Sequence, residues 1–319
     1  MKELDFIKII SNTLSDSRLI GDDCAYLKDL DIFITQDSLV ENVHFSLKTT
    51  TPYKLGRKSI AVNISDIAAS ISTPKYVLIS LSIPSYLDEN FIEEYYKGVN
   101  DICKEYNVTV AGGDITGSDK LFISITAIGK KTSKFISSRS FAKKDDVIIA
   151  TGNFGSSACG LYCLSKNINA NENIINAHID PIPKVENGLE LAEIANQNIA
   201  VMDTSDGLID ALYKISEASK CSIEVDFDKI PYDKEIENIA TKYNQNYKDW
   251  IFWGGEDYEL IACVPEEYIN KLAKNEFKVI GKVTEKSENP NIYIKNNGEN
   301  LVITKEIFEN KSFNHFERK

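Results

Sequence analysis

The stretch PYKLGRKSIAVNISDIAASIST, residues 52–73, carries a long helical pattern. Pro52 suits the first turn of a helix, where the missing N–H has no partner to lose. Apolar residues recur at helical spacing and line one broad face: Leu55, Ile60, Ile64, Ile67, Ala68 and Ile71. The next apolar run, VLISLSI at 77–83, is typical of a strand and is closed by Pro84. The pattern predicts a helix over 52–73 followed by a strand.

On both sides of this pair, the chain mixes helices and strands. In the first half we expect helices around 6–14 and 88–106, and strands at 32–35, 107–111 and 121–129. In the second half we expect helices at 155–165, near 185–197 and after Asp206-Gly207, and strands at 147–151, 198–202, 222–227, 257–264 and 278–283. The elements do not alternate strictly, which favours an α+β fold. The polar, basic stretch 130–146 is the predicted domain link.

The composition is that of an ordinary globular chain. It has 319 residues, of which 43% are hydrophobic and 26% charged, and this excludes a disordered or collagen-like chain. The formal net charge of −12 disfavours a surface for nucleic acid or anionic membranes. No apolar run approaches the ~18 residues of a membrane span, and the N-terminus is not that of a secretory signal. Six cysteines without a CxxC pair predict reduced, mostly buried thiols in a cytoplasmic protein.

Acidic residues recur beside predicted strands, often in turns that contain glycine. These sites are Gly21-Asp22-Asp23, Asp37, Ser65-Asp66, Gly112-Gly113-Asp114, residues 203–207 (DTSDG) and residues 254–257 (GGED). A single Asp-Gly pair is usually a turn or a helix cap, but six such sites favour a site for Mg²⁺ and phosphate. If the carboxylates converge, each pair at ~5 Å repels by about 3 kcal/mol at an effective dielectric near 20, so bound cations would be needed.

The common nucleotide-binding motifs are missing. The chain has no GxGxxG, no protein-kinase signature set and no GxSxG. Residues 155–160 (GSSACG) have the glycine spacing of a P-loop, but Leu161 stands where the lysine is required. That stretch is therefore expected to be a helix start with small packing residues.

Seven motifs together carry a family resemblance. They are GDDCA (21–25), QDSLVENVHF (36–45), GRKSIAVNISDIAAS (56–70), AGGDIT (111–116), ISITAIG (123–129), MDTSDGLIDAL (202–212) and GGEDYEL (254–260). In this order they resemble the thiamine-monophosphate kinases of the aminoimidazole ribonucleotide synthetase (PurM-like) superfamily. The match runs from about residue 3 to residue 283.

The resemblance implies transfer of a phosphoryl group from ATP to thiamine monophosphate, assisted by several Mg²⁺ ions. It also implies a two-domain α+β fold, with a strand-rich N-terminal domain (1–137) that binds ATP and Mg²⁺ and forms a homodimer. The C-terminal domain (138–319), an α/β sandwich, would complete the nucleotide and substrate site. Phosphoryl transfer needs positioning and charge neutralisation more than a strong base, which fits a cluster of acids.

Roles also carry over residue by residue. The implied metal ligands are Asp23, Thr35, Gln36, Asp37, Asp66, Asp114, Asp203 and Asp206, of which Asp23, Asp66, Asp114 and Asp206 are also assigned to catalysis. Gln36 departs from the hydroxyl residue common at its place. The implied ATP contacts are Gly113, Asp114, Arg139 and Ser205. The implied contacts to thiamine monophosphate are His44, Glu256 and a C-terminal aromatic, for which Phe313 and Phe316 are the candidates.

Several of these residues have an ordinary structural interpretation as well. His44 could be a core histidine, Arg139 a solvated charge, and Tyr106 either core packing or a neighbour of adenine. Asp22 could orient its turn, Asp257 could be structural, and Asp210 is expected on a helix surface. Two other functions are left open: another ATP-dependent enzyme of the superfamily, such as aminoimidazole ribonucleotide synthetase or selenophosphate synthetase, and a non-catalytic nucleotide-binding module.

Overall fold

Helix α2 (Pro52–Ala69) lies at the junction of two β-sheets. The computed structural model describes residues 3–272, 276–296 and 298–314. Thr51 caps the helix by accepting the Lys54 N–H, and Pro52 opens its first turn as expected. The helix ends at Ala69, four residues earlier than predicted. Ile71 takes a positive φ, and pairing with the neighbouring strand begins at Ser72, so strand formation replaces the last helical turn.

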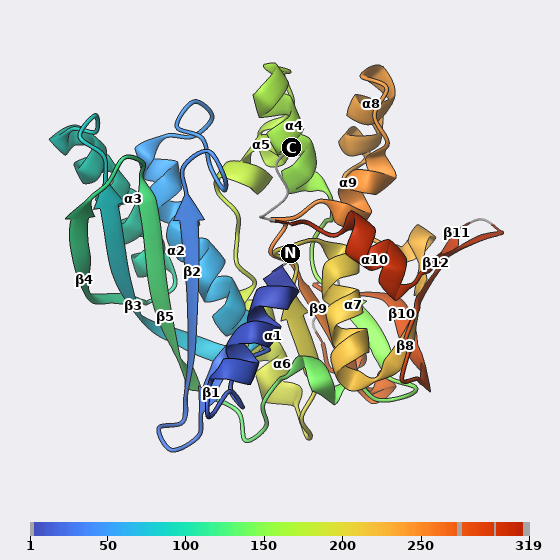
Figure 1. The fold of residues 1–319 in the computed structure, drawn as a ribbon. Coiled ribbons are helices and arrows are strands. Elements are labelled where there is room, and N and C mark those ends of the chain that lie inside the picture. The colour runs from blue at the N-terminus through green and yellow to red at the C-terminus, as the bar shows by residue number, and fades with distance from the viewer. Residues whose placement is uncertain (1–2, 273–275, 297, 315–319) are drawn as a thin grey trace.

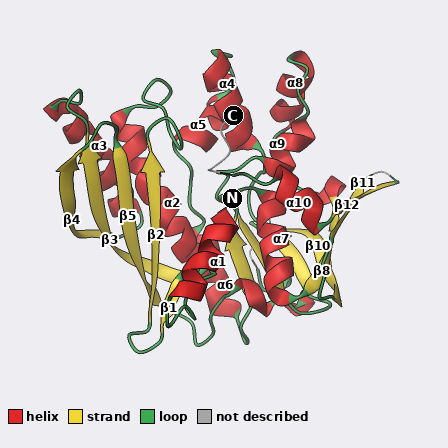
Figure 2. Ribbon diagram, viewed as in Figure 1, coloured by secondary structure: helices red, strands yellow, loops and turns green. Residues whose placement is uncertain are grey.

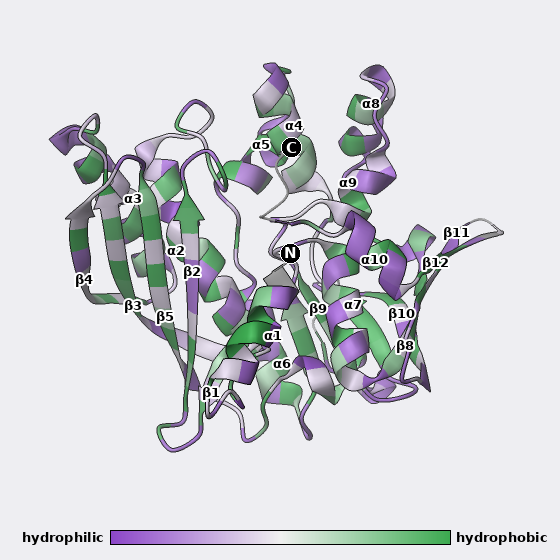
Figure 3. Ribbon diagram, viewed as in Figure 1, coloured by the Kyte–Doolittle hydropathy of each residue, from purple (hydrophilic) through white to green (hydrophobic). Residues whose placement is uncertain are grey.

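The first sheet has the strand order β1-β2-β5-β3-β4. Its strands are β1 (Ala25–Leu27), β2 (Ile32–Val40), β3 (Ser72–Ile83), β4 (Thr109–Gly117) and β5 (Phe122–Lys131). β3 and β4 are parallel and the other pairs antiparallel. Along β2, β3 and β5, buried and more exposed side chains alternate. Figure 3 shows apolar and polar residues mixed along these strands. Helices α2 and α3 (Glu89–Glu105) pack on the buried face, and none of the described helices covers the other face.

The second sheet has the order β12-β11-β8-β10-β6-β9-β7. Its strands are β6 (Val147–Ala150), β7 (Ala200–Asp203), β8 (Cys221–Asp226), β9 (Leu260–Val264), β10 (Lys278–Lys286), β11 (Ile292–Asn296) and β12 (Glu299–Ile303). One face packs against α7 (Leu208–Ser219), α9 (Tyr247–Trp253) and α10 (Lys305–Lys311). The other face packs against α6 (Val185–Ile194) and, through Ala69, against the end of α2.

The remaining helices lie around these two sheets. They are α1 (Glu3–Thr13), α4 (Ser156–Lys166), α5 (Glu172–Ile179) and α8 (Lys234–Lys242). Figure 2 shows the mixture of helices and strands on both sides of α2, which confirms the predicted α+β class. We call residues before the link at 130–146 the first lobe and those after it the second lobe. A boundary at 137/138 remains a proposal.

The predicted link is fixed to both lobes rather than loose. Ser137 forms a β-bridge with Ile199, and its hydroxyl donates to the Ala69 carbonyl over 2.6 Å. A short 3-10 helix, Arg139–Phe141, follows. Because the link passes beside the end of α2, it carries Arg139 to the junction of the lobes.

Candidate active site

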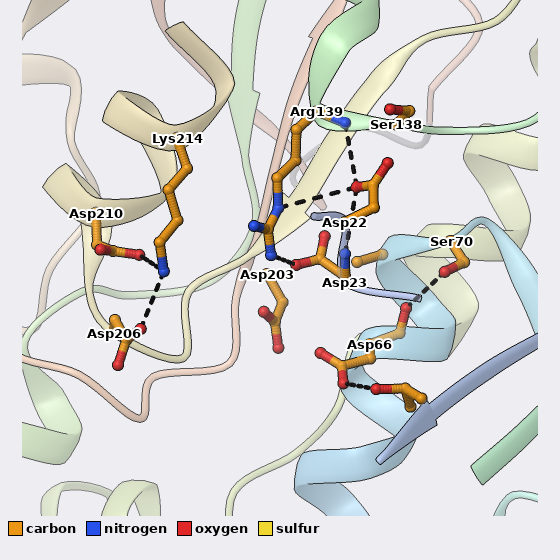
Figure 4. A network of polar contacts seen from close by, with 12 residues as sticks. Asp22, Asp23, Asp66, Ser70, Ser138, Arg139, Asp203, Asp206, Asp210 and Lys214 are labelled. Carbon is orange, nitrogen blue, oxygen red and sulfur yellow. Dashed lines mark hydrogen bonds and ion pairs between the residues drawn. The ribbon is translucent and has the colours of Figure 1, made fainter. Parts of the chain in front are cut away.

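Three carboxylates meet where the lobes join. Oxygen atoms of Asp23, Asp66 and Asp203 all lie within 4.8 Å of one another. Asp23 precedes β1, Asp66 lies on α2, and Asp203 ends β7. Figure 4 shows these three side chains gathered in one place. Oxygen ligands from three separate segments are the kind of set that holds Mg²⁺.

Hydroxyl groups hold two of the three carboxylates. Thr35 donates to Asp66 Oδ2 over 2.5 Å, and Ser65 donates to Asp203 Oδ2 over 2.6 Å. The second oxygen of Asp203, Oδ1, is buried and has no hydrogen-bond partner among the described residues. A buried acceptor without a donor is unfavourable, and a bound cation would satisfy it.

The charges of the cluster perturb one another. Burial raises the pKa of Asp66 well above its usual value, and the charges of Asp37 and Asp203 raise it further. Burial, and then the charge of Asp23, raise the pKa of Asp203 to about 8. A divalent cation in the cluster would reverse these shifts by stabilising the ionised forms.

Strand alternation decides which residues of β2 face the cluster. Thr35 and Asp37 share one face of the strand, and the Asp37 N–H donates to Asn63 Oδ1 over 3.0 Å. Gln36 points to the opposite face, where its Oε1 accepts from Thr126 over 2.9 Å. The structure therefore does not bring the Gln36 side chain, expected among the metal ligands, to the cluster.

The turn after β7 carries Ser205 and Asp206. Asp206 accepts from Lys214 of α7 over 3.1 Å, and Lys214 also pairs with Asp210 at 2.6 Å. Asp210 is buried, so its expected place on the helix surface was wrong. Burial raises the pKa of Asp210 to about 6 although Lys214 opposes that shift. Lys214 was not singled out in the sequence, although it follows Asp210 by four residues, the spacing of an ion pair within one helix.

Arg139 lies next to the acidic cluster and is not a solvent-exposed charge. Its guanidinium donates to Asp23, and its Nε lies 3.9 Å from Asp22 Oδ1. Asp22 Oδ1 also accepts the backbone N–H groups of Asp23 and Arg139, so Asp22 orients this turn as expected. Figure 4 shows Arg139 beside Asp22 and Asp23, with Lys214 and its two aspartates on the opposite side of Arg139 from Asp22.

Glu256 sits in a turn that packs against the turn after β7. The Glu256 N–H donates to the Ser205 carbonyl over 2.7 Å, and a Cβ on Gly255 would come within 2.6 Å of that same oxygen. The turn therefore requires glycine at 255. The strand expected at 257–264 begins only at Leu260.

The carboxylate of Glu256 contacts two residues that the sequence did not single out. Lys58 Nζ and His178 Nδ1 both lie 3.2 Å from Glu256 Oε2. In the sequence, the one feature that pointed to either residue was the position of Lys58, a charged residue within the apolar helical pattern of 52–73. His44 lies on the turn after β2, and its Nδ1 accepts the Val40 N–H over 3.0 Å.

Of the two candidates for the C-terminal aromatic, the structure describes Phe313. Lys311 at the end of α10 lies 5.6 Å from the ring centroid of Trp253, which adjoins the turn of Gly254 and Glu256. Phe313 follows two residues later and is exposed. Phe316 lies outside the described residues.

Gly113 and Asp114 lie on the edge strand β4, away from the cluster. Gly113 is in register with Ile79 and Asp114 with Ser80 of β3, and all of β4 is exposed. Two strands, β3 and β5, separate β4 from β2, so at about 4.8 Å per strand Asp114 is about 14 Å from β2. A single chain does not bring Asp114 to the other acids.

In the P-loop-like stretch, residues 155–160, backbone N–H groups already bind a carboxylate of the chain. Asp257 accepts the N–H of Gly155 over 2.6 Å and that of Ser157 over 3.0 Å at the start of α4. This confirms a helix start with small residues and gives Asp257 a structural role. Tyr106 packs against the first core at the end of α3, which supports the core-packing interpretation.

Comparisons with known proteins agree with this geometry. Residues 21–130 match the AIR synthase related protein N-terminal domain, and residues 143–290 match the corresponding C-terminal domain. A thiamine-monophosphate kinase of Bacillus subtilis is 34% identical over 99% of this chain and 100% of that protein. One of Haemophilus influenzae is 37% identical over 84% of this chain and 83% of that protein.

Solved structures give the same relationship. The structure of AaThiL complexed with AMPPCP and TMP superposes with a TM-score of 0.83 at 30% identity, covering 94% of this chain and 96% of that one. A hydrogenase maturation protein HypE in complex with ATP has a TM-score of 0.71 at 17% identity, covering 93% of each chain, and shares the fold alone. No helix within the described residues is long and apolar enough to cross a membrane.

Proposed function

We propose a reaction for this chain from the premise that it belongs to the thiamine-monophosphate kinase family of AIR synthase related proteins. The chain is a kinase by this relationship. The proposed reaction transfers the terminal phosphoryl group of ATP to thiamine monophosphate and yields ADP and thiamine diphosphate. A relative of known structure was solved with an ATP analogue and TMP, which supports both substrates.

One observation supports the mechanism most directly: three carboxylates converge, and one of their oxygens is buried with no donor in the part of the chain that the structure describes. Asp23, Asp66 and Asp203 would hold Mg²⁺, with Asp37 beside them. Bound Mg²⁺ would supply the positive charge that two phosphate-bearing substrates need in order to meet. Thr35 and Ser65 would keep two of the carboxylates oriented for that purpose.

The other carried-over residues are assigned by the same proposal. Ser205, in the turn after β7, and Arg139, which pairs with Asp23, would bind ATP. Asp206, now paired with Lys214, would join the metal ligands when that pair opens. His44, Glu256 and Phe313 would contact thiamine monophosphate. The acceptor is a phosphate monoester whose oxygen needs little deprotonation at neutral pH, so no strong general base is required.

We also propose a homodimer formed through the first sheet. Its uncovered face and edge strand expose Tyr76, Leu78, Val110 and Ile115. An exposed edge strand with apolar side chains is a surface that another copy can cover. Gly113 and Asp114 lie on that edge, so their assigned ATP and metal contacts would form at or near the dimer surface. The six cysteines are buried and free, which supports the expected cytoplasmic location.

The decisive experiment supplies the purified protein with ATP, Mg²⁺ and thiamine monophosphate as the only acceptor. We expect stoichiometric ADP and thiamine diphosphate by chromatography. Parallel reactions with formylglycinamidine ribonucleotide or with selenide test the other two enzyme types. ATP consumption with either of these and none with thiamine monophosphate would overturn the proposal, and so would tight ATP binding without turnover of any acceptor.

A further inference from the structure

Lys58 is a buried lysine at the junction of the lobes. It lies in the second turn of α2, and its side chain is only 3% exposed. Its Nζ donates to the His178 carbonyl over 2.9 Å and to Glu256 Oε2 over 3.2 Å. Both partners belong to the second lobe. A lysine is so deeply buried only when it is paired, so these contacts must outweigh the loss of water around its charge.

His178 holds the same carboxylate from a second direction. It is the penultimate residue of α5, and its side chain is 7% exposed. Its Nδ1 lies 3.2 Å from Glu256 Oε2 and 3.2 Å from the hydroxyl of Ser157. Ser157 is itself fixed, because its N–H donates to Asp257. The imidazole is thus held between the first turn of α4 and Glu256.

The two contacts leave Glu256 with one oxygen available. Both use Oε2, and no described residue hydrogen-bonds to Oε1. The Glu256 side chain is 24% exposed, several times more than those of Lys58 and His178. Of the three charged or polar groups in contact, Glu256 is therefore the one that a ligand can reach.

The same contacts set the charge of this group. Burial alone would raise the pKa of Glu256, but Lys58 and the hydrogen bond from His178 outweigh it and lower that pKa to about 2. The carboxylate is consequently anionic at all physiological pH values. An anion at this place suits a cationic heterocycle such as thiazolium, or the amino group of an aminopyrimidine.

We propose that Lys58 and His178 are positioning residues for the acceptor, which fix Glu256 Oε2 so that Oε1 is presented to the cationic or amino-bearing part of that ligand. This rests on the proposed function for the identity of the acceptor. It adds that α2 of the first lobe takes part in acceptor binding without touching the acceptor. Acceptor affinity therefore depends on a contact between the lobes.

The test measures equilibrium binding of thiamine monophosphate and, separately, of ATP with Mg²⁺ by calorimetry. Lys58→Met should weaken thiamine monophosphate at least tenfold and ATP less than twofold, while Lys58→Arg should recover most of the loss. Lys54→Met is the matched control. Lys54 lies one turn earlier on α2 and also bridges the lobes, but its partner is Asp180, at 2.6 Å. Its replacement should change neither affinity more than twofold.

A double-mutant cycle separates positioning from general support. If Lys58 acts through Glu256, the Lys58→Met and Glu256→Gln changes together should weaken acceptor binding no more than twofold beyond Glu256→Gln alone. His178→Phe, which removes the donor, should behave as Lys58→Met does and serves if the lysine variant does not fold. Unchanged acceptor affinity in either folded variant, or losses that multiply with that of Glu256→Gln, would overturn the proposal.

Failure of the positioning role can be distinguished from failure of the proposed reaction. Wild-type protein that binds thiamine monophosphate but does not phosphorylate it would refute the reaction alone, and the cycle could still be run. Wild-type protein that turns the acceptor over, with Lys58→Met binding it normally, would refute the positioning role alone. Absence of any binding to the wild type would refute both.

Discussion

The Ser65 hydroxyl of α2 donates to Asp203 Oδ2 at the end of β7 over 2.6 Å. This bond joins the first lobe to the second inside the acidic cluster. It occupies one oxygen of Asp203, while the other, Oδ1, is buried and has no partner within residues 3–272, 276–296 and 298–314. The orientation of a proposed metal ligand thus depends on a residue from the other lobe.

Replacing Ser65 with Ala should weaken Mg²⁺ binding about tenfold, because groups that orient a metal ligand typically contribute this much. Isothermal calorimetry on the folded variant measures it. Ser59→Ala is the control, since Ser59 is equally buried on α2 but bonds to Tyr95 and Gly56. Equal Mg²⁺ affinity in the two variants would contradict the role of Ser65.

Removing the metal should stop the reaction. The acids of the cluster repel one another and the phosphates of ATP, so EDTA should abolish turnover and Mg²⁺ should restore it. Asp66→Asn should lose most activity without unfolding, as judged by circular dichroism. Full turnover in protein shown by elemental analysis to be metal-free would show that the cluster has another purpose.

Loss of Arg139 should destabilise the protein. Arg139→Met leaves Asp23 buried beside Asp66 and Asp203 without its cation, and breaking such a pair typically destabilises by about 3–5 kcal/mol. Chemical denaturation measures the change. Because Mg²⁺ can take over part of the neutralisation, saturating Mg²⁺ should stabilise this variant more than the wild type. An equal Mg²⁺ effect on both proteins would argue against a shared site.

The proposed dimer can be tested at the edge strand. Ile115 on β4 is 66% exposed, and Ile115→Asp should place charges in the interface and give a monomer in sedimentation experiments. Ile182 in the second lobe is 62% exposed, and Ile182→Asp should leave the dimer intact. A wild-type protein that sediments at 35.8 kDa at low micromolar concentration would contradict the assembly.

Asp257 should make stability depend on pH. Burial raises its pKa to about 7 in the folded chain, above the ordinary value of 3.8, although the N–H groups of Ser157 and Gly155 oppose the shift. A carboxyl whose folded pKa is raised contributes stability below its unfolded pKa and loses it as pH rises through the folded value. The free energy of unfolding should fall between about pH 4 and pH 7 through this group. Asp257→Asn should show a smaller fall, and an identical pH profile would contradict this assignment.

Short-range features of the chain were predictable from the sequence. Apolar spacing and Pro52 identified α2, and the acids next to strands identified most of the cluster, because periodicity and turn chemistry act over a few residues. The ordered motifs identified the family. The sequence did not predict the end of α2 or the burial of Asp210, since strand pairing and helix packing decided these.

The pairings that build the site were decided only by the tertiary structure. Ser65 and Asp203 are 138 positions apart, and Lys58 and Glu256 are 198 apart. No local sequence pattern indicates that residues so far apart along the chain are in contact, because both partners are placed by the packing of separate sheets and helices on α2. Burial also depends on the tertiary structure. Arg139 lies in a polar stretch of the sequence, but in the fold its side chain is largely buried and pairs with Asp23. The sequence determined which groups were available, and the fold determined their neighbours and hence their charges.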